Sequence, residues 1–505
     1  MISPPMADVV LTTFNARYHH TSFALRYLKA NLGDLAGSCQ ILEFDLDTRP
    51  GDALEQVLLH QPRIVGLALY IWNTRQSLEF ARMLKALRPA IALIVGGPEA
   101  SYEHDAQPIS SVADYILCGE VDLAFSELCQ AIMAGQRPPQ RIIQPDPPDL
   151  NRVAMPYHLY TDDDLKHRTI YVESSRGCPF SCEFCLSSLD VPVRRFPLDA
   201  FLAEMQKLLD RGCRQFKFVD RTFNVEISHA CTILQFFLEK LKTKELFLHF
   251  EMIPDRLPEQ VRDLLVKFPP GSLQLEVGVQ SFDQSITERI GRHQDNARVE
   301  ANLRFLREHT HAHIHADLIA GLPGETFDSF AAGFDRLLAL RPHEIQLGIL
   351  KRLRGVPIAR HSDAFGMIYS PEAPYEIMEN ALIDFATMQR LKRMARYWDM
   401  FANSGNFRDS LPLLWANGSP FHLFIAFTDF VYERTGKTHQ IALPRQFELL
   451  WDYLKHPKIA GRSLAADYLR PHRRDLPEFL KPFAPPIAPR ESLLPTQRRQ
   501  HRHRA

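Results

Sequence analysis

Three cysteines lie close together in the chain, and their spacing is typical of a metal-binding loop. Three residues separate Cys178 from Cys182, and two separate Cys182 from Cys185. A single loop with these spacings can place three thiolates around one inorganic centre, and a [4Fe-4S] cluster held in this way keeps one iron open to a reacting molecule. A structural zinc site would need a fourth nitrogen or sulfur ligand, for which Cys213 is the candidate. Buried thiols without a metal are the third interpretation.

Polar side chains also stand at the ends of several strand-like runs later in the chain. They are Glu251, Glu276, Gln280 and Asp317, and a Gly-Leu-Pro-Gly turn begins at Gly321. The carboxyl ends of parallel strands meet at one edge of a sheet, where a ribose or an amino acid can be hydrogen-bonded. Taken singly, each residue could be satisfied inside the fold, but together they favour a binding site.

Two alternating series of elements would position these residues. In the first series, short aliphatic runs alternate with amphipathic stretches such as 22–31 and 74–87. Five strands with helical crossovers predict a doubly wound parallel α/β sheet of the flavodoxin or Rossmann type. The five strand-like runs are 9–14, 41–44, 64–69, 91–95 and 115–118.

The second series runs from about residue 169 to residue 348 and has six strand-like runs. Helical patterns such as 201–209 and 327–340 separate them. Six successive βα units predict a partial, TIM-like barrel, with the three cysteines in the loop above its first strand. The runs are 169–173, 216–219, 246–251, 273–277, 313–319 and 344–348.

These patterns divide the chain into five expected parts. The segment 135–165 contains many prolines and is predicted to be a linker between the first α/β domain and the barrel. After the barrel, aromatic residues recur at helical spacing, which predicts the packed core of a helical accessory domain. The expected parts are 1–134, the linker 135–165, the barrel 166–360, the helical domain 361–481 and a disordered basic tail 482–505.

Composition narrows the class of partner. The chain has 59 basic and 60 acidic residues, so its net charge produces no electrostatic field that would attract nucleic acid or anionic lipid. A small-molecule substrate is expected instead. Eight cysteines in 505 residues are too few for a disulfide scaffold. No apolar run approaches the roughly 18 residues needed to cross a bilayer, and the first residues lack the pattern of a signal peptide. These features predict a cytoplasmic protein.

The cysteine segment resembles the signature loop of the radical S-adenosyl-L-methionine (radical SAM) enzymes. In that family an aromatic residue precedes the third cysteine, and Phe184 stands at this position. The resemblance implies a [4Fe-4S] cluster whose open iron binds S-adenosyl-L-methionine (AdoMet). One electron from an external donor such as flavodoxin or ferredoxin would cleave AdoMet to methionine and a 5'-deoxyadenosyl radical. The cofactors would supply the difficult chemistry, and the protein their orientation.

The later strand ends look like those of the radical SAM branch that includes the coproporphyrinogen oxidases and methylthiotransferases. This likeness implies that Gln280 and Asp317 bind ribose hydroxyls, that Arg292 binds the methionine carboxylate, and that the backbone at Gly321 approaches adenine. Glu251 and Glu276 would face the same site. One feature departs from the pattern, because the glycine-rich turn that often follows the second strand is absent, and Asp220 would take its place.

The strand exits of the first series carry glycines and polar residues, which admit a large flat ligand close to the backbone. A dinucleotide site is disfavoured, because no G-x-G-x-x-G follows the first strand. Placed before a radical SAM core, this part resembles the cobalamin (B12)-binding module of cobalamin-dependent radical SAM enzymes, over about residues 1–355. The residues implied to contact cobalamin are Asn15, His19, Tyr70, Asn73, Gly96, Gly97, Gly119 and Glu120.

A lower cobalt ligand is not specified by this resemblance. The Asp-x-His-x-x-Gly sequence that supplies a histidine to cobalt in other cobalamin proteins is missing. Cobalamin would therefore bind with its own base displaced. His19 or His20 is the candidate ligand, and the alternative is that both histidines bond only to phosphate or water.

The resemblance makes a methyltransferase acting on an unactivated carbon the leading hypothesis. One AdoMet would methylate cobalamin, and a second would supply the radical that removes a substrate hydrogen before the methyl group is transferred. A radical rearrangement or cyclisation without methyl transfer is the alternative reaction. A cobalamin- or redox-responsive binding protein is the alternative of a different class.

Overall fold

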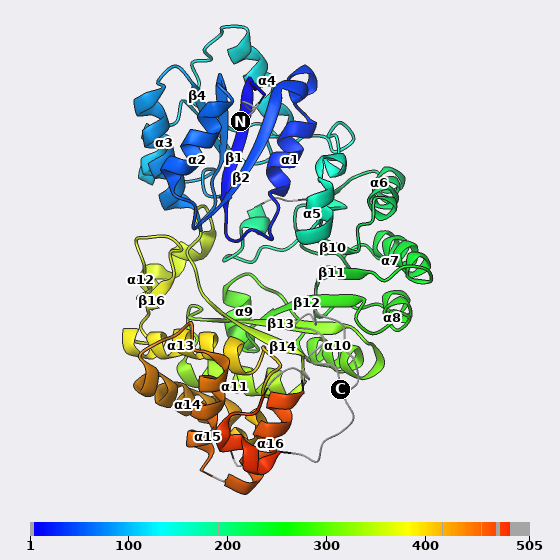
Figure 1. Ribbon diagram of the computed structural model, residues 1–505, viewed down its shortest axis with the longest axis vertical. Coiled ribbons are helices and arrows are strands. Elements are labelled where there is room, and N and C mark those ends of the chain that lie inside the picture. Colours follow the sequence, from blue (N-terminus) through cyan, green and yellow to red (C-terminus); the bar gives the residue numbers. More distant parts are fainter. Residues whose placement is uncertain (1–4, 190–191, 417, 456, 471–474, 485–505) are drawn as a thin grey trace.

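Three regions are stacked along the longest axis of the protein, as the computed structural model in Figure 1 shows. The structure describes residues 5–189, 192–416, 418–455, 457–470 and 475–484. An α/β domain lies at one end, a second parallel sheet lies in the middle, and a group of helices lies at the other end. Within these described ranges, no helix is both long and apolar enough to cross a membrane.

The first domain is a doubly wound parallel sheet, which confirms the predicted α/β architecture. Its strand order is β2-β1-β3-β4-β5-β6, and all its pairings are parallel. The interior strand β1 is buried along its whole length, as expected for a strand covered on both faces. The strands are β1 (Val9–Asn15), β2 (Cys39–Asp45), β3 (Ile64–Ala68), β4 (Ala92–Gly96), β5 (Tyr115–Leu117) and β6 (Ile142–Ile143).

Two helices cover each face of this sheet. Residues of α1 (Phe23–Ala30) and α4 (Asp122–Met133) share one hydrophobic cluster with the sheet, and residues of α2 (Pro50–Leu59) and α3 (Thr74–Leu87) share another. The sequence pattern did not predict β6, which the segment after α4 adds at the sheet edge. This segment, expected as a linker, also contains the short helix α5 (Asp162–His167), whose first turn is capped by Thr161.

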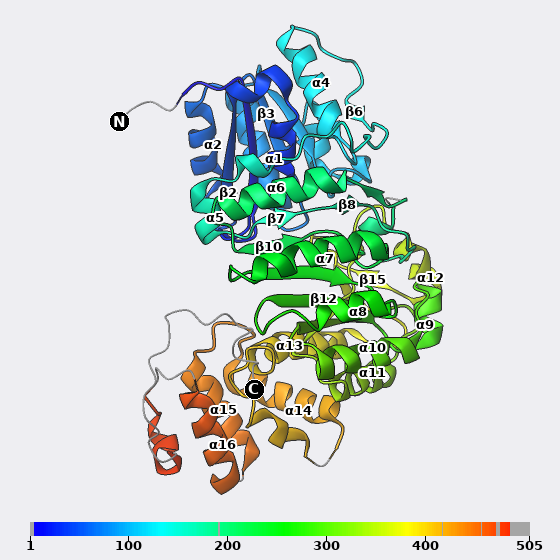
Figure 2. The ribbon, with the colours of Figure 1, turned by 90° about the vertical axis from the view of Figure 1, so that its right-hand side faces the viewer.

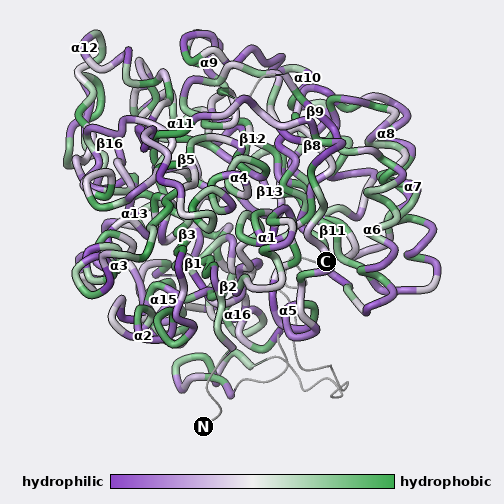
Figure 3. The backbone as a smooth tube through the Cα atoms, turned by 90° about the horizontal axis from the view of Figure 1, so that it is seen from above, coloured by the Kyte–Doolittle hydropathy of each residue, from purple (hydrophilic) through white to green (hydrophobic). Residues whose placement is uncertain are grey.

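The second sheet has six parallel strands in the order β14-β13-β12-β11-β10-β7, which confirms the predicted partial barrel. Figures 2 and 3 show α6, α7 and α8 side by side along one flank of the molecule. The strands are β7 (Tyr171–Val172), β10 (Gln215–Phe218), β11 (Phe247–Met252), β12 (Leu273–Gln280), β13 (His313–Ala320) and β14 (Glu344–Ile349). The helices are α6 (Leu198–Asp210), α7 (Ile227–Leu241), α8 (Glu259–Leu265), α9 (Gln284–Arg289), α10 (Asn296–His309) and α11 (Phe327–Ala339).

The C-terminal region is mainly helical, and its aromatic side chains form a packed core, as expected from their spacing. Trp398 lies 4.8 Å from Phe334 of α11 and 4.9 Å from Phe424, measured between ring centroids. A small hairpin precedes the helices. These elements are α12 (Ser362–Phe365), β15 (Ile368–Tyr369), β16 (Ile377–Glu379), α13 (Phe385–Phe401), α14 (Pro420–Thr435), α15 (Leu443–Leu454), α16 (Pro457–Leu469) and the 3-10 helix η8 (Glu478–Phe483). Residues 485–505 of the predicted tail lie outside the described residues.

Buried ion pairs join the first domain to the segment that leads into the barrel. Arg26 of α1 lies 2.9 Å from Asp164 of α5 and 3.1 Å from Glu43 of β2. Arg168 contacts the same two carboxylates. Removal of one partner would leave an uncompensated buried charge, which typically destabilises by about 3–5 kcal/mol. These pairs therefore hold the two sheets in one relative position.

Candidate active site

A cavity of about 180 Å³ opens at the carboxyl ends of the barrel strands, and the three cysteines line it. We call it the cysteine cavity. It brings together most of the residues that the sequence placed in one site, although they are spread over more than 130 positions of the chain. Those residues are Cys178, Cys182, Phe184, Cys185, Glu251, Glu276, Gln280, Arg292 and Asp317.

The cysteine loop is held on its inner side by the turn after α9. The loop begins and ends in two short antiparallel strands, β8 (Ser175–Arg176) and β9 (Arg194–Arg195). The backbone N–H of Glu183 donates to the Ile290 carbonyl at 2.9 Å. Gly291 has φ +67°, and a Cβ at this position would lie 2.6 Å from the Ser181 carbonyl oxygen. Only glycine allows so close an approach.

Glu183 anchors the same loop on its outer side. Its side chain is buried, and its carboxylate accepts hydrogen bonds from Arg360 Nε at 3.0 Å and from His361 Nε2 at 2.8 Å. The Ile358 N–H donates to the Glu183 carbonyl at 3.0 Å. The segment after the barrel therefore fixes the loop that carries the cysteines.

Arg292 joins the cysteines to the end of β12. Its Nη1 lies 3.7 Å from Cys182 Sγ, its Nε donates to Gln294 Oε1 at 2.8 Å, and its Nη2 donates to the Gly278 carbonyl. Burial raises the pKa of the Cys178 and Cys182 thiols, and the Arg292 guanidinium opposes this rise. A cation is thus placed where thiolates would form on metal binding.

Two buried acceptor atoms at the cavity wall make no hydrogen bond within the described residues, and His315 Nε2 lies 3.7 Å from one of them, Asp317 Oδ1. Gln280 follows a register shift in β12 and has φ +70°, and its Oε1 has no hydrogen-bond partner among the described residues. Within the same ranges, Asp317 Oδ1 also lacks a hydrogen bond, and burial, with the nearby Glu276 and Glu251 carboxylates, raises the pKa of Asp317. Unsatisfied buried polar atoms of this kind are rare, and both can accept hydrogen bonds from ligand hydroxyls.

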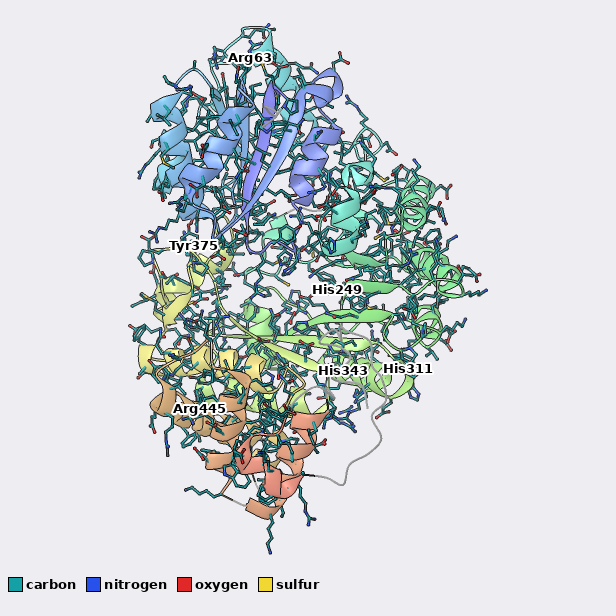
Figure 4. All side chains as sticks on the ribbon, viewed as in Figure 1. Arg63, His249, His311, His343, Tyr375 and Arg445 are labelled. Carbon is teal, nitrogen blue, oxygen red and sulfur yellow. The ribbon has the colours of Figure 1, made fainter. Side chains whose placement is uncertain are left out.

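The other two carboxylates of the cavity already have cationic or imidazole partners. Burial opposes ionisation of Glu276, but the hydrogen bond with His249 Nε2 at 2.9 Å lowers the pKa of this carboxyl to about 2. His249 lies on β11 in the middle of the sheet (Figure 4). Glu251 accepts from Arg221 Nη1 at 3.0 Å and 3.2 Å. Both carboxylates are therefore held in fixed orientations.

Three residues considered from the sequence do not line this cavity. Asp220, expected to replace the missing glycine-rich turn, is buried and accepts from Ser174 Oγ at 2.6 Å and Ser175 Oγ at 2.7 Å. Gly321, expected beside adenine, packs against the C-terminal region, because a Cβ there would lie 2.7 Å from an Ile377 methyl carbon. Cys213, considered as a fourth zinc ligand, is buried with its Sγ 3.4 Å from the Gln215 carbonyl.

A second cavity, of about 430 Å³, lies at the carboxyl ends of the strands of the first sheet. We call it the glycine cavity. Gly97 has φ +111°, and a Cβ there would lie 2.5 Å from the Leu69 carbonyl oxygen. Gly119 has φ +75° with no atom within 4 Å of such a Cβ, so its lack of a side chain keeps space open. Five of the residues predicted to contact cobalamin line this cavity: Tyr70, Gly96, Gly97, Gly119 and Glu120.

The other predicted cobalamin residues are not among those that line the glycine cavity. Asn73 is fully buried and donates to the Phe14 and Ala68 carbonyls, so it ties strand ends together. Asn15 donates to the carbonyl of His20 at 2.9 Å. The Nδ1 of His20 lies 2.6 Å from the Tyr171 hydroxyl, and burial, with the adjacent His19, lowers the pKa of His20 to about 4.

The two cavities meet at residues that the sequence did not single out. Ser187 and Arg221 line both of them. Arg221 lies three residues after the end of β10, so its place near a strand end was the signal that could have identified it. Arg176 also lines the glycine cavity, where its guanidinium contacts Asp122 at 2.7 Å and Glu173 at 2.9 Å and lies over the Tyr27 ring.

The residues present fit the cofactors implied by the resemblance. Three thiols on one loop beside Arg292, with unsatisfied acceptors at Gln280 and Asp317, suit a thiolate-bound cluster and a ligand that carries hydroxyl and carboxylate groups. The glycine cavity suits a large flat ligand. Within the described residues, no three histidine, cysteine or acidic side chains are gathered as they would be around a single metal ion.

Three known family models match successive parts of the chain. Residues 9–129 match the B12 binding domain, and residues 172–337 match the Radical SAM superfamily. Residues 363–493 match a protein family of unknown function, DUF4080.

Relatives share only part of their length with this chain. The chain is 25% identical over 334 residues to the cobalamin-dependent radical SAM methyltransferase TokK of Streptomyces tokunonensis. The matched region covers 57% of this chain and 47% of TokK. It is 24% identical to the 2-(S-pantetheinyl)-carbapenam-3-carboxylate methyltransferase of Streptantibioticus cattleyicolor, over 56% of this chain and 46% of that protein. The chain therefore spans about half the length of the curated relatives it matches.

A solved structure shares the fold over a larger part of the chain. It is the radical S-adenosylmethionine methyltransferase TsrM from Kitasatospora setae, solved with tryptophan substrate and a SAM analogue. The TM-score is 0.56 at 18% identity, and the match covers 77% of each chain.

Proposed function

We propose that this chain, which joins a B12 binding domain to a Radical SAM superfamily domain, is a cobalamin-dependent radical SAM enzyme that methylates an unactivated carbon of a small-molecule substrate. The observation that carries the proposal is the meeting of the cysteine cavity and the glycine cavity at Ser187 and Arg221. A substrate at this junction would contact both cofactor sites at once.

The cofactors would supply the reactive groups, and the chain would orient them. When bound, the [4Fe-4S] cluster with AdoMet supplies a 5'-deoxyadenosyl radical, and cobalamin supplies a methyl group. Cys178, Cys182 and Cys185 would hold the cluster. Arg292 would bind a carboxylate, and the acceptor atoms of Gln280 and Asp317 that make no hydrogen bond among the described residues would bind hydroxyls of AdoMet.

The protein's own contribution would be positioning and exclusion of water. The cysteine loop is fixed from two sides, by the Ile290–Gly291 turn and by the Arg360 and His361 contacts to Glu183. Arg221 is held by Glu251 and lines both cavities. Preorganised groups of this kind keep reacting atoms in place, so that little further free energy is needed to reorganise the site during turnover.

Anaerobic reconstitution tests the proposal. The reconstituted chain should contain iron and sulfide at cluster stoichiometry, bind hydroxocobalamin and, with a reductant such as reduced flavodoxin or ferredoxin, form 5'-deoxyadenosine from AdoMet. With methyl-deuterated AdoMet, label should appear in the corrinoid fraction and in an acceptor of increased mass. Zinc in place of iron would refute the radical chemistry. Deoxyadenosine with unlabelled corrinoid and products of unchanged mass would refute methyl transfer in favour of a rearrangement.

A further inference from the structure

The segment that follows the barrel contacts the first domain at a cluster of charged and aromatic side chains. Figure 4 shows Tyr375 at the level where this segment meets the N-terminal domain. Tyr375 precedes β16 and belongs to the region that matches a family of unknown function. Its phenol donates a hydrogen bond to Glu99 Oε1 at 2.5 Å across 276 positions of the sequence.

Glu99 is a buried carboxylate whose partners come from outside its own domain. Arg354 Nε donates to the same Oε1 at 2.8 Å, and the Arg354 guanidinium lies over the Tyr375 ring at 4.9 Å. Burial and the neighbouring Glu99 carboxylate raise the pKa of Tyr375 to about 12, so the phenol stays a donor at neutral pH. Buried charges persist in proteins when they are paired in this way.

The neighbouring Glu103 strengthens the same contact. It accepts from Arg352 Nη2 at 2.9 Å and from Arg354 Nη1 at 3.1 Å. Gly355 has φ +82° and packs on Tyr102, because a Cβ there would lie 2.4 Å from a ring carbon. The residues 352–355 that follow the barrel and Tyr375 therefore contact the same loop of the first domain.

That loop forms one wall of the glycine cavity. It follows β4 and starts with Gly97, which lines the cavity together with Gly96, the last residue of β4. Ser101 Oγ donates to the Gly97 carbonyl at 2.9 Å and accepts from the Gly119 N–H at 3.0 Å. The loop held by Tyr375 is therefore connected to both glycine turns that keep the cavity open.

From this geometry we infer that Tyr375 is a positioning residue for the cobalamin site: through Glu99 it fixes the 96–103 loop, so that the C-terminal region shapes the glycine cavity. The inference rests on the proposed function in that cobalamin is the ligand of this cavity. It assigns a role to part of the C-terminal region, which otherwise packs against α11 and β14 away from both cavities.

The test compares Tyr375→Phe with Tyr369→Phe in the full chain. Tyr369 lies in the same hairpin, and its hydroxyl contacts Met367 Sδ at 3.5 Å, so it controls for the loss of a hydroxyl. Tyr375→Phe should speed amide hydrogen exchange of residues 97–103 in the cofactor-free chain. It should also weaken hydroxocobalamin binding by up to about tenfold, because a loop freed of a hydrogen bond to a charged group must be ordered when the ligand binds. The iron content after reconstitution should stay close to that of the Tyr369→Phe control, and the melting temperature should fall below that of the control only by the few degrees that one lost hydrogen bond costs.

The outcomes separate this inference from the proposed function. Equal exchange and equal affinity in both variants would overturn the role of Tyr375. Faster exchange with unchanged affinity would also overturn it, because the contact would then be only structural. If Glu99→Ala already causes the full loss, Tyr375→Phe should add nothing to it, and an additive loss would contradict a shared contact. A wild-type chain that does not bind hydroxocobalamin would instead refute the cobalamin part of the proposed function, and with it this inference.

Discussion

Replacement of Gly291 by alanine is expected to displace the cysteine loop, and Gly212→Ala supplies a matched control. Both glycines have positive φ values, +67° and +96°. A Cβ on Gly291 would lie 2.6 Å from the Ser181 carbonyl oxygen, whereas no atom lies within 4 Å of a Cβ on Gly212. The two variants therefore share the backbone strain and differ in the contact with the cysteine loop.

The two contributions can be estimated separately. A left-handed backbone conformation costs an L-residue about 1–2 kcal/mol, and this applies to both variants. The additional contact in Gly291→Ala requires the Ser181 carbonyl to move by several tenths of an ångström, and such overpacking typically costs about 1–3 kcal/mol. We therefore expect a loss in free energy of unfolding of about 2–5 kcal/mol for Gly291→Ala and about 1–2 kcal/mol for Gly212→Ala.

Two measurements check this expectation. Denaturant unfolding of the cofactor-free chains gives the difference in stability of the barrel, and iron and sulfide analysis after anaerobic reconstitution reports whether the loop still accepts a cluster. Gly212→Ala should incorporate iron as the wild type does, and Gly291→Ala should incorporate much less. If both variants are equally stable and incorporate equal iron, the packing of the cysteine loop on this turn does not position the cysteines.

Three further substitutions test individual site residues. Cys182→Ala should abolish iron incorporation and leave hydroxocobalamin binding unchanged, because none of the three cysteines lines the glycine cavity; a metal analysis beside a spectroscopic titration checks both, and retained AdoMet cleavage would contradict the ligand assignment. Glu276→Gln removes a carboxyl whose pKa the His249 hydrogen bond lowers from 4.5 to about 2. A carboxyl whose pKa is lower in the folded than in the unfolded state stabilises the fold at a pH above the unfolded-state pKa, and this stabilisation is lost as the pH falls. Between about pH 5 and pH 2 the wild type should therefore lose about 3 kcal/mol more stability than the variant. Parallel acid-unfolding curves would be inconsistent with this. Asp317→Asn removes a carboxyl whose pKa burial raises, so it should increase the melting temperature at neutral pH and weaken AdoMet binding in equilibrium dialysis; a lower melting temperature would argue against the assigned burial effect.

Much of the fold could be predicted from the sequence, because buried parallel strands are continuous aliphatic runs separated by amphipathic helices. The six barrel strands and the first five strands of the N-terminal sheet were identified in this way. The two-residue strands β6, β8, β9 and β15 were not identified, since two residues are too few to show a period. Their pairing depends on neighbours that the chain supplies elsewhere.

The structure brings the residues of the cysteine motif into one cavity, whereas residues chosen by strand position alone lie in different surroundings. The cysteines, Gln280 and Arg292 line one cavity as expected. Asp220 and Asn73 also stand near strand ends, but their polar atoms are used by neighbouring strands and loops. A polar residue at a strand end can point into the crevice or tie the loops together, and local sequence does not distinguish the two orientations.

The sequence by itself determined the two parallel sheets and the cysteine loop, because these depend on spacing and hydrophobic period within short segments. The cofactor classes followed from the resemblance of those segments to the radical SAM enzymes and to the cobalamin-binding module. Only the tertiary structure decided how the cavities meet at Ser187 and Arg221, how Glu183 is anchored by His361, and how Tyr375 reaches Glu99. Those contacts join residues tens to hundreds of positions apart. They form because burying a charge is favourable only beside a partner, and which partner arrives is set by the packing of the whole chain.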